Sequence, residues 1–316
     1  MRILVTGATG FIGSALSKRL VEMGYDVWGM IRFTSSTRKL PDGVKPIYGD
    51  LIDQCSLVGV IKTVRPEIVM HLGALTPVSL SFERPRMYLE TNFYGTVRLA
   101  ETCRRHAEEC LGLFMFAGTT EMFNTKMDID VLTPFEPTSP YAVSKVCAVH
   151  YLEMLHRVYD FPVVTLIPTN TYGRANVNQK HFVIEKLITS MLEGKEKILM
   201  GSPDKMRDFM FREDHVNAYI SVLKKYEEEG NGRLKGARYV FGTGRAHTIL
   251  DVFKLCRDLT GWDGEVVWNV YHRPFDQDVI CTDPSVAKAL LGWEAKYDLK
   301  SGIKKAIEEW KEVLGI

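Results

Sequence analysis

The amino-acid sequence predicts an α/β protein built on a doubly wound parallel sheet, with a smaller α/β lobe toward the C-terminus. Three observations support this fold class. Short apolar runs alternate with helical patterns through the first half of the chain, a glycine-rich turn joins the first run to the first helix, and the alternation stops after Pro168. Alternating strands and helices favour a parallel sheet with helices on both faces. The chain has 316 residues, which is enough for one large domain and a smaller one.

The short apolar runs are typical of buried strands, since helices need longer periodic segments. They predict strands at 2–6, 26–30, 45–48, 68–72, 113–117, 163–167 and 239–242. Helical spacing is clearest in residues 14–23, 81–107, 141–157 and 182–193. We expect residues 1–168, with about 209–242, to form the main domain, and residues 169–208 and 243–316 to form the smaller lobe.

Glycines follow the first predicted strand and open the first helix. A strand, a glycine turn and a helix together are typical of dinucleotide binding, because glycines let the backbone approach a pyrophosphate and the helix N-terminus offers it free N–H groups. The alternative is a glycine-rich turn without a ligand. The pattern favours a Rossmann-type domain whose cofactor contacts include Gly7, Gly10, Phe11, Ile12 and Gly13.

The second strand bears on which dinucleotide is bound. An NAD site usually places a carboxylate at the end of this strand for the ribose 2′-hydroxyl. Here the strand is followed by Arg32 and a run of hydroxyl residues, which suit a 2′-phosphate and favour NADP, with NAD as the alternative. Asp50, after the third strand, is expected to accept a hydrogen bond from adenine, and Leu51 and Leu72 are assigned to the same cofactor site.

Tyr141 and Lys145 lie four residues apart in a predicted helix and therefore share one face. A nearby ammonium stabilises a tyrosinate, so the phenol is expected to act as a base nearer neutral pH. Thr119 follows the buried run 113–117, and its hydroxyl is expected to bind the same substrate oxygen. The alternative is an amphipathic helix that carries the two side chains by chance. His71, inside a buried strand, is interpreted as a core histidine.

These motifs together resemble the extended short-chain dehydrogenase/reductases that act on nucleotide sugars. They are Thr-Gly-x-x-Gly-x-x-Gly at the start, Gly-Asp-Leu at 49–51, His-Leu-Gly-Ala at 71–74, Asn92 within Thr-Asn-Phe-Tyr-Gly-Thr, and Tyr-x-x-x-Lys. Thr119-Thr120-Glu121 is similar to the dehydratase form of the motif, and the stretch up to Lys145 to the GDP-mannose 4,6-dehydratases. The chain departs from those enzymes at Phe33, where they carry a second arginine, at Pro77 and at 170–174.

The resemblance implies a 4,6-dehydratase mechanism. Tyr141 would remove the proton of the sugar 4-hydroxyl while the cofactor takes a hydride from C4, Lys145 would bind the nicotinamide ribose, and Thr119 would orient O4. Glu121 would remove the C5 proton, with Thr120 or Glu121 assisting the loss of water from C6. The alternatives are a 4-epimerase or reductase that uses the same tyrosine and lysine, and a dinucleotide-sensing protein without turnover.

The resemblance also implies substrate contacts and an assembly. The expected contacts are made by Arg207 and Arg273 to the diphosphate, and by Asn170, Asn92, Thr76 and Ser81 to the nucleotide sugar. The helical stretches 81–107 and 141–157 are expected to pair across a two-fold axis, which predicts a homodimer.

Composition limits the other classes of function. The net charge of +1 predicts no attraction to nucleic acid or to a membrane surface, and no apolar run reaches the roughly 18 residues that span a bilayer. The six cysteines show neither close pairing nor metal-ligand spacing, so we expect reduced thiols, a cytoplasmic protein and no metal site.

Overall fold

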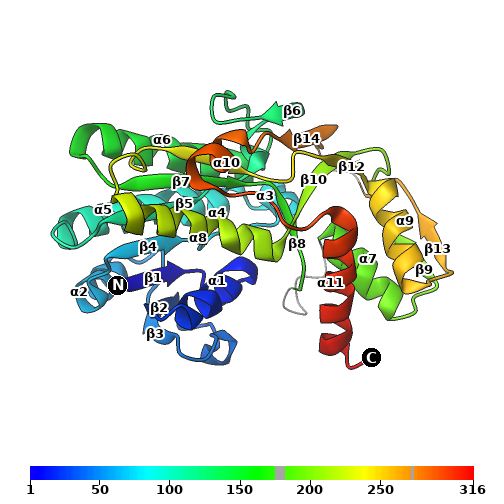
Figure 1. The fold of residues 1–316 in the computed structure, drawn as a ribbon, viewed down its shortest axis with the longest axis horizontal. Coiled ribbons are helices and arrows are strands. Elements are labelled where there is room, and N and C mark those ends of the chain that lie inside the picture. The colour runs from blue at the N-terminus through cyan, green and yellow to red at the C-terminus, as the bar shows by residue number, and fades with distance from the viewer. Residues whose placement is uncertain (175–181, 272–273) are drawn as a thin grey trace. The chain divides into compact units, whose positions relative to one another are not determined.

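A computed structural model describes residues 1–174, 182–271 and 274–316 (Figure 1). These residues form two compact units. The first unit comprises Met1–Phe123, Pro134–Ile167 and Val216–Tyr239, and the second comprises Asn124–Thr133, Pro168–His215 and Val240–Ile316. The chain therefore leaves the first unit and returns to it, and the two units are described separately below.

A seven-stranded sheet with the order β11-β7-β5-β4-β1-β2-β3 organises the first unit. The pairs that join β7, β5, β4, β1, β2 and β3 are all parallel. The chain runs outward from β1 to β3 and then crosses back to β4 on the other side of β1, which is the topological switch of a doubly wound sheet. The predicted Rossmann-type fold is confirmed. The strands are β1 (Arg2–Thr6), β2 (Asp26–Ile31), β3 (Lys45–Tyr48), β4 (Ile68–His71), β5 (Leu113–Ala117), β7 (Val163–Pro168) and β11 (Arg238–Phe241).

The central strands are buried along their whole length, which explains their continuous apolar sequences. Every residue of β4 is buried, and so are the first four residues of β5. Helices cover both faces of such a sheet, so its strands show no alternation of polar and apolar residues. The seven strands lie within two residues of the predicted ranges.

The helices of the first unit fill the connections between these strands (Figure 1). α2 packs against α5, and α5 packs against α6. Each of the three helices lies in a connection that leads from the β3 side of the sheet toward the β11 side. Because such connections are right-handed, the three helices lie on one face of the sheet. They are α1 (Phe11–Glu22), η1 (Thr37–Lys39), α2 (Gln54–Val64), α3 (Val78–Glu83), α4 (Pro85–Tyr88), η2 (Leu89–Tyr94), α5 (Gly95–His106), η3 (Thr120–Met122), α6 (Pro140–Tyr159) and α8 (Arg212–Glu229), the last of which begins in the second unit.

The single helix predicted over residues 81–107 is wrong. The chain forms four consecutive helical segments instead, α3, α4, the π-helical segment η2 and α5. Proline has no N–H to donate and its ring clashes with the preceding turn, so Pro85 begins a new helix after Arg84, whose backbone is not helical. The π-helical segment at Leu89–Tyr94 adds a second interruption.

The second unit is built around β10. This strand pairs in parallel with β8 and β14 and antiparallel with β12, while β14 also pairs with β6, and β9 and β13 form a separate ribbon. Apart from α7, these elements were not individually predicted. They are β6 (Lys126–Ile129), β8 (Asn170–Tyr172), α7 (Val183–Leu192), β9 (Lys197–Leu199), β10 (Met206–Phe211), β12 (Ala246–Thr248), α9 (Ile249–Thr260), β13 (Glu265–Val267), β14 (Val279–Thr282), α10 (Ser285–Leu291) and α11 (Leu299–Leu314).

A buried carboxylate ties the second unit together. Asp208 in β10 has no exposed surface, and its carboxylate accepts hydrogen bonds from the backbone N–H of Thr243 at 3.0 Å and of Gly244 at 3.2 Å, and from the hydroxyl of Thr282. Burial nevertheless raises the pKa of Asp208. Because a buried charge is costly unless it is hydrogen-bonded, these contacts fix the segment after β11 against β10 and β14.

Two glycine-to-alanine substitutions test the packing of the first unit. A Cβ on Gly13 would lie 2.1 Å from the carbonyl oxygen of Gly7, whereas a Cβ on Gly59, inside α2, meets no atom within 4 Å. We expect Gly13→Ala to lower the free energy of unfolding by about 1–3 kcal/mol through overpacking. We expect Gly59→Ala to raise it by about 0.5–1 kcal/mol, because alanine favours a helix interior. Urea denaturation of the two variants measures both, and changes of the same sign would contradict this packing.

Candidate active site

The glycine turn after β1 has the geometry that a pyrophosphate needs. Gly7 has a φ of 70°, in the left-handed region, and its carbonyl accepts a hydrogen bond from the N–H of Gly10 at 2.8 Å. A Cβ on Gly7 would lie 2.9 Å from the backbone nitrogen of Gly73. No side chain caps the first turn of α1, which begins at Phe11 and continues through Ile12 and Gly13. The glycines therefore allow the turn to pack against the backbone at Gly73, and the first turn of α1 has no side-chain cap, which fits a dinucleotide pyrophosphate at its N–H groups.

The other predicted cofactor residues follow the neighbouring strands. Arg32 comes directly after β2 and is exposed, while Asp50 and Leu51 come after β3 and Leu72 after β4. Because these strands are parallel neighbours, the residues emerge at the same edge of the sheet as the glycine turn. The Asp50 carboxylate accepts the N–H of Ile52 at 3.2 Å, so it shapes the turn in which it lies.

Helix α6 brings Tyr141 and Lys145 to one face. The hydroxyl of Ser139 caps this helix by accepting the N–H of Ala142 at 3.1 Å, and Pro140 occupies the first turn. Both features start the helix at this point, which places Tyr141 and Lys145 one turn apart near its N-terminus. Tyr141 is 7% exposed and Lys145 is 3% exposed.

The ammonium of Lys145 is held in a largely apolar environment. Its Nζ donates a hydrogen bond to the carbonyl of Ala117 at 2.8 Å and lies 4.9 Å from the ring centroid of Phe116. Burial lowers the pKa of Lys145 to about 7. The end of β5 thus provides both the hydrogen-bond acceptor and the aromatic face that a desolvated ammonium needs.

The pKa of Tyr141 lies above its ordinary value in the ligand-free chain. Burial raises the pKa of Tyr141, a hydrogen bond with the side chain of Thr119 lowers it, and the charge of Glu121 raises it again. Desolvation of the phenol, which disfavours the charged tyrosinate, is the largest of these effects.

The segment after β5 gathers the remaining predicted catalytic residues. Thr119 hydrogen-bonds Tyr141 through its side chain, and its Oγ1 also accepts the N–H of Glu121 at 3.2 Å. The carboxylate of Glu121 is close enough to affect the ionisation of Tyr141. Thr120 is buried, as Tyr141 and Lys145 are. The structure thus brings together Thr119, Glu121, Tyr141 and Lys145.

Sequence reasoning missed an aromatic neighbour of the site. The ring of Tyr88 packs edge-on against the ring of Tyr141, with centroids 6.3 Å apart and planes at 87°. Its hydroxyl donates to the carbonyl of Pro77 at 2.5 Å. No motif marks this residue, because it reaches Tyr141 from a separate helix. His71 is 1% exposed, and both of its ring nitrogens contact threonine hydroxyls, those of Thr6 and Thr96, so it is part of the core.

Two residues that are predicted to contact substrate are buried and hydrogen-bonded within the chain. Asn92 is 1% exposed, and its amide nitrogen donates to the carbonyl of Leu75 at 3.0 Å and to the hydroxyl of Ser144 at 3.1 Å. Both amide hydrogens are therefore used to join the segment after β4 to α6. Ser81 has no exposed surface, and its hydroxyl donates to the carbonyl of Val78 at 2.6 Å. Thr76, by contrast, is exposed.

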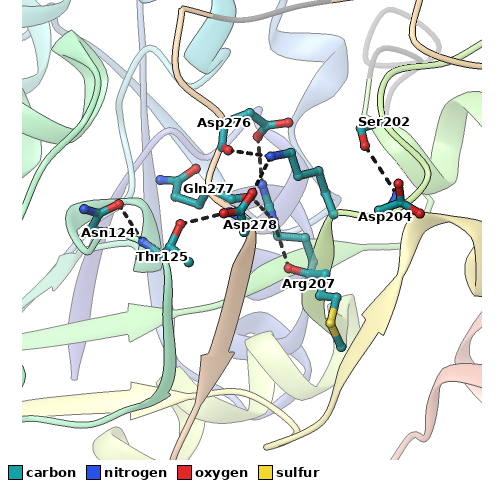
Figure 2. A network of polar contacts seen from close by, with 10 residues as sticks. Asn124, Thr125, Ser202, Asp204, Arg207, Asp276, Gln277 and Asp278 are labelled. Carbon is teal, nitrogen blue, oxygen red and sulfur yellow. Dashed lines mark hydrogen bonds and ion pairs between the residues drawn. The ribbon is translucent and has the colours of Figure 1, made fainter.

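Arg207 in the second unit, which the resemblance assigns to the diphosphate, makes contacts within the chain. It is 6% exposed, its Nη1 donates to the carbonyls of Met206 and Gln277 at 2.8 and 2.9 Å, and its Nη2 pairs with the carboxylate of Asp276 at 2.8 Å (Figure 2). A parallel contact joins Lys205 to Asp278 at 2.6 Å. Arg207 thus holds the segment before β14 in place, and Arg273 lies outside the described residues.

Asn170 is the first residue of β8 and, unlike Arg207, has a buried polar group without a hydrogen-bond partner among the described residues. That group is the Nδ2 of its side-chain amide. A buried amide without a partner costs free energy, and such a group is a candidate for binding a ligand.

Among the described residues, no group of three or more histidine, cysteine or acidic residues is arranged to hold a metal ion. No helix among them is long and apolar enough to cross a membrane.

A tyrosine and a lysine on one helical turn, together with a glycine turn after the first strand of a doubly wound sheet, are typical of an extended short-chain dehydrogenase/reductase. Within that class, the chain belongs to the family described as GDP-mannose 4,6 dehydratase, which it matches over residues 4–306. It is therefore an enzyme of the nucleotide-sugar dehydratase and epimerase group.

Relatives and solved structures carry both dehydratase and epimerase names. The chain is 31% identical to GDP-mannose 4,6 dehydratase 1 of Arabidopsis thaliana, over 97% of this chain and 88% of that protein. It is 30% identical to the UDP-glucose 4-epimerase of Thermotoga maritima, solved with UDP-glucose, with a TM-score of 0.89 over 99% and 100% of the two chains. The Thermus thermophilus UDP-glucose 4-epimerase, solved with NAD, is 26% identical with a TM-score of 0.85 over 98% and 99%.

The buried ammonium of Lys145 predicts a pH-dependent stability. Its pKa is about 7 in the folded chain and about 10.4 in an unfolded chain, so unfolding between these pH values takes up a proton. The free energy of unfolding therefore rises with pH in this window. We expect Lys145→Met to remove the rise, so that the difference between wild type and variant grows by roughly 1 kcal/mol per pH unit from about pH 7.5 to 9.5.

Urea denaturation of the ligand-free protein at several pH values measures this difference. Lys18→Met is the matched control, because the Lys18 side chain is 70% exposed and should give a difference that does not change with pH. A flat difference for Lys145→Met would contradict the burial of its charge.

The two ion pairs in Figure 2 give a second stability prediction. Asp276→Asn removes a carboxylate from the buried guanidinium of Arg207 and should lower the free energy of unfolding by about 1–3 kcal/mol. Asp278→Asn removes the carboxylate from the partly exposed Lys205, and Asp278 itself is 80% exposed, so a loss of less than about 1 kcal/mol is expected. Equal losses in chemical denaturation would show that Arg207 does not depend on Asp276.

Proposed function

We propose that this enzyme is an NADP-dependent nucleotide-sugar 4,6-dehydratase, which converts an NDP-hexose into the NDP-4-keto-6-deoxyhexose and water. The observation that carries the proposal is the placement of Glu121. Its carboxylate belongs to the same short segment as Thr119 and acts electrostatically on Tyr141. A dehydratase needs a second base beside the tyrosine because it removes a proton from C5, whereas an epimerase does not.

The first stage is the oxidation of the 4-hydroxyl. When bound, the oxidised cofactor supplies a hydride acceptor for C4, returns the hydride later at C6, and adds a positive charge that favours the tyrosinate. Tyr141 accepts the proton of the 4-hydroxyl, and Thr119, already hydrogen-bonded to Tyr141, is placed to share the same oxygen. Lys145 supports the anionic phenolate from the next turn of α6.

The second stage is the elimination of water. The C4 ketone acidifies the C5 proton, and Glu121 accepts it. The resulting carboxylic acid donates a proton to the C6 hydroxyl, which leaves as water with its bonding electrons, and a double bond forms between C5 and C6. Hydride addition at C6 and proton addition at C5 complete the product. We assign the acid role to Glu121 because it holds the proton taken from C5, and Thr120, the next residue along the chain toward Thr119, is the alternative.

Substrate binding is proposed for the second unit. The unpartnered Nδ2 of Asn170 supports a hydrogen bond to a phosphate or sugar oxygen. Arg207 remains a candidate for the diphosphate, on the condition that its contact with Asp276 is shared or exchanged, and Arg273 is a second candidate. GDP-mannose is the first substrate to test, because the family description names it.

NADP is proposed as the cofactor because Arg32 is exposed after β2 and no carboxylate stands at that strand end. The Thermus thermophilus neighbour was solved with NAD, which makes NAD the competing cofactor.

A 4-epimerase is the second candidate function. It is favoured by the similarity to the Thermotoga maritima UDP-glucose 4-epimerase along essentially the whole chain. In this alternative, Thr119, Tyr141 and Lys145 keep their roles, and Glu121 only contacts the substrate.

A homodimer is proposed from the apolar surface of the first unit. Side chains that α4, η2 and α6 leave exposed include Met87 at 51%, Tyr94 at 50% and Val158 at 61%. An exposed apolar face on neighbouring helices is typical of an oligomer interface. We expect a solution mass of twice 35.9 kDa at micromolar concentration by light scattering. Met87→Glu with Tyr94→Glu should give the monomer, whereas Leu132→Glu, at a second-unit residue that is 85% exposed, should not.

The substitution Glu121→Gln separates the dehydratase from the epimerase. Glutamine keeps the size and hydrogen bonding of glutamate but cannot accept a proton. We expect the variant to oxidise C4, giving NADPH absorbance, and to lose at least about 100-fold in formation of the 4-keto-6-deoxy product. The exposed Glu136→Gln serves as control and should retain activity.

Isotope labelling completes this test. In deuterated water, wild type should place solvent deuterium at C5, while the hydride moved from C4 to C6 stays unexchanged. Normal turnover by Glu121→Gln, or a product without deuterium at C5, would refute the dehydratase and leave the epimerase.

A further inference from the structure

An exposed pair of stacked aromatic rings lies at the edge of the sheet that carries the glycine turn. Phe33 follows Arg32 after β2 and is 80% exposed, and Tyr48 is the last residue of β3 and is 44% exposed. Their ring planes differ by 3°, with centroids 4.8 Å apart. The two residues are brought together by the parallel register of β2 and β3, in which Ile31 is opposite Tyr48.

The exposure of Phe33 is not explained by the fold of the chain. One face of its ring rests on Tyr48, so the exposed surface includes the opposite, flat face. Single exposed apolar residues are common on proteins, but a phenylalanine held flat against a second ring is a preorganised stacking surface. Tyr48 acts as the support that keeps Phe33 in this orientation.

The surroundings of the pair indicate the chemistry of what would cover it. Arg32 precedes Phe33, and the following segment to Leu40 contains Arg38 and Lys39 but no acidic residue. Asp50 lies two residues after Tyr48, in the turn that follows β3. A flat apolar ring, in a segment that carries cations and no acidic residue, matches a purine nucleotide, whose base stacks and whose phosphate is anionic.

The sheet places this surface beside the pyrophosphate turn. β1 lies next to β2, with Thr6 opposite Met30, so the turn at Gly7 and the residues Arg32 and Phe33 emerge from adjacent strands at one edge. We propose that Phe33, supported by Tyr48, is the stacking surface for the adenine ring of the dinucleotide. This inference rests on the proposed function, since it requires a dinucleotide at the glycine turn.

Recognition by stacking has a specific consequence. Arg32 would act on the 2′-phosphate, which only NADP carries, whereas Phe33 would act on adenine, which NADP and NAD share. Loss of Phe33 should therefore weaken both cofactors by a similar factor, and loss of the charge at Arg32 should weaken NADP alone. Stacking also responds less to salt than a charge contact does.

Calorimetric titration of the ligand-free protein with fragments tests the assignment without turnover. We expect Phe33→Ala to weaken binding of 2′,5′-ADP and of 5′-AMP by roughly tenfold or more, and to leave binding of nicotinamide mononucleotide within about twofold. Phe33→Trp should restore the affinity, and the loss should persist at high salt. Leu132→Ala, at an exposed apolar residue of the second unit, is the control and should change nothing. Thermal unfolding shows whether each variant is folded.

The outcomes separate this inference from the proposed function. Binding of 2′,5′-ADP to Phe33→Ala within twofold of wild type, or an equal loss for nicotinamide mononucleotide, overturns the stacking role while dinucleotide binding by wild type stands. Wild type that binds no dinucleotide overturns both. Arg32→Asp should lose the preference for NADP while retaining the dependence on Phe33. If it keeps that preference, Arg32 is not the source of the selectivity for NADP, and the role of Phe33 is unaffected.

Discussion

The common direction of the strands in the seven-stranded sheet is the constraint on which the rest of the first unit depends. Because neighbouring strands run in parallel, every segment that follows a strand emerges at the same edge. The glycine turn at Gly7, the pair Arg32 and Phe33, Asp50 and Thr119 come from four different strands in this way. Residues more than a hundred positions apart can therefore form one site only while this direction is kept.

Burial sets the electrostatics of that site. The same desolvation lowers the pKa of Lys145 and raises the pKa of Tyr141, so before a ligand is bound it disfavours the charged form of both groups. A buried ammonium and a buried phenolate each need a partner of opposite charge. The chain supplies the Ala117 carbonyl as an acceptor for Lys145 and a hydrogen bond between Thr119 and Tyr141.

The sequence predicted the elements that depend on local patterns of apolar residues and on helical spacing. The apolar runs of β4 and β5 indicated strands because both faces of the sheet are covered, and the Tyr-x-x-x-Lys spacing indicated one helical face. Tertiary partners could not be predicted in this way. The sequence shows that Arg207 is charged, but its pairing with Asp276 depends on the fold. The fold likewise determines that both amide hydrogens of Asn92 are used within the chain. The second-unit strands β9 and β13 have three residues each and pair across a long separation, which leaves no local period to detect.

The π-helical segment at Leu89–Tyr94 gives the chain an uneven tolerance to changes in length. A π segment accommodates one more residue than the α-helical turn it replaces, so a deletion there can be absorbed by reverting to α-helical geometry without rotating α5. A deletion between Tyr141 and Lys145 cannot be absorbed in this way, because α6 is a regular α-helix there. Each residue of an α-helix turns the chain by about 100°, so the ammonium would be carried away from the face of the phenol.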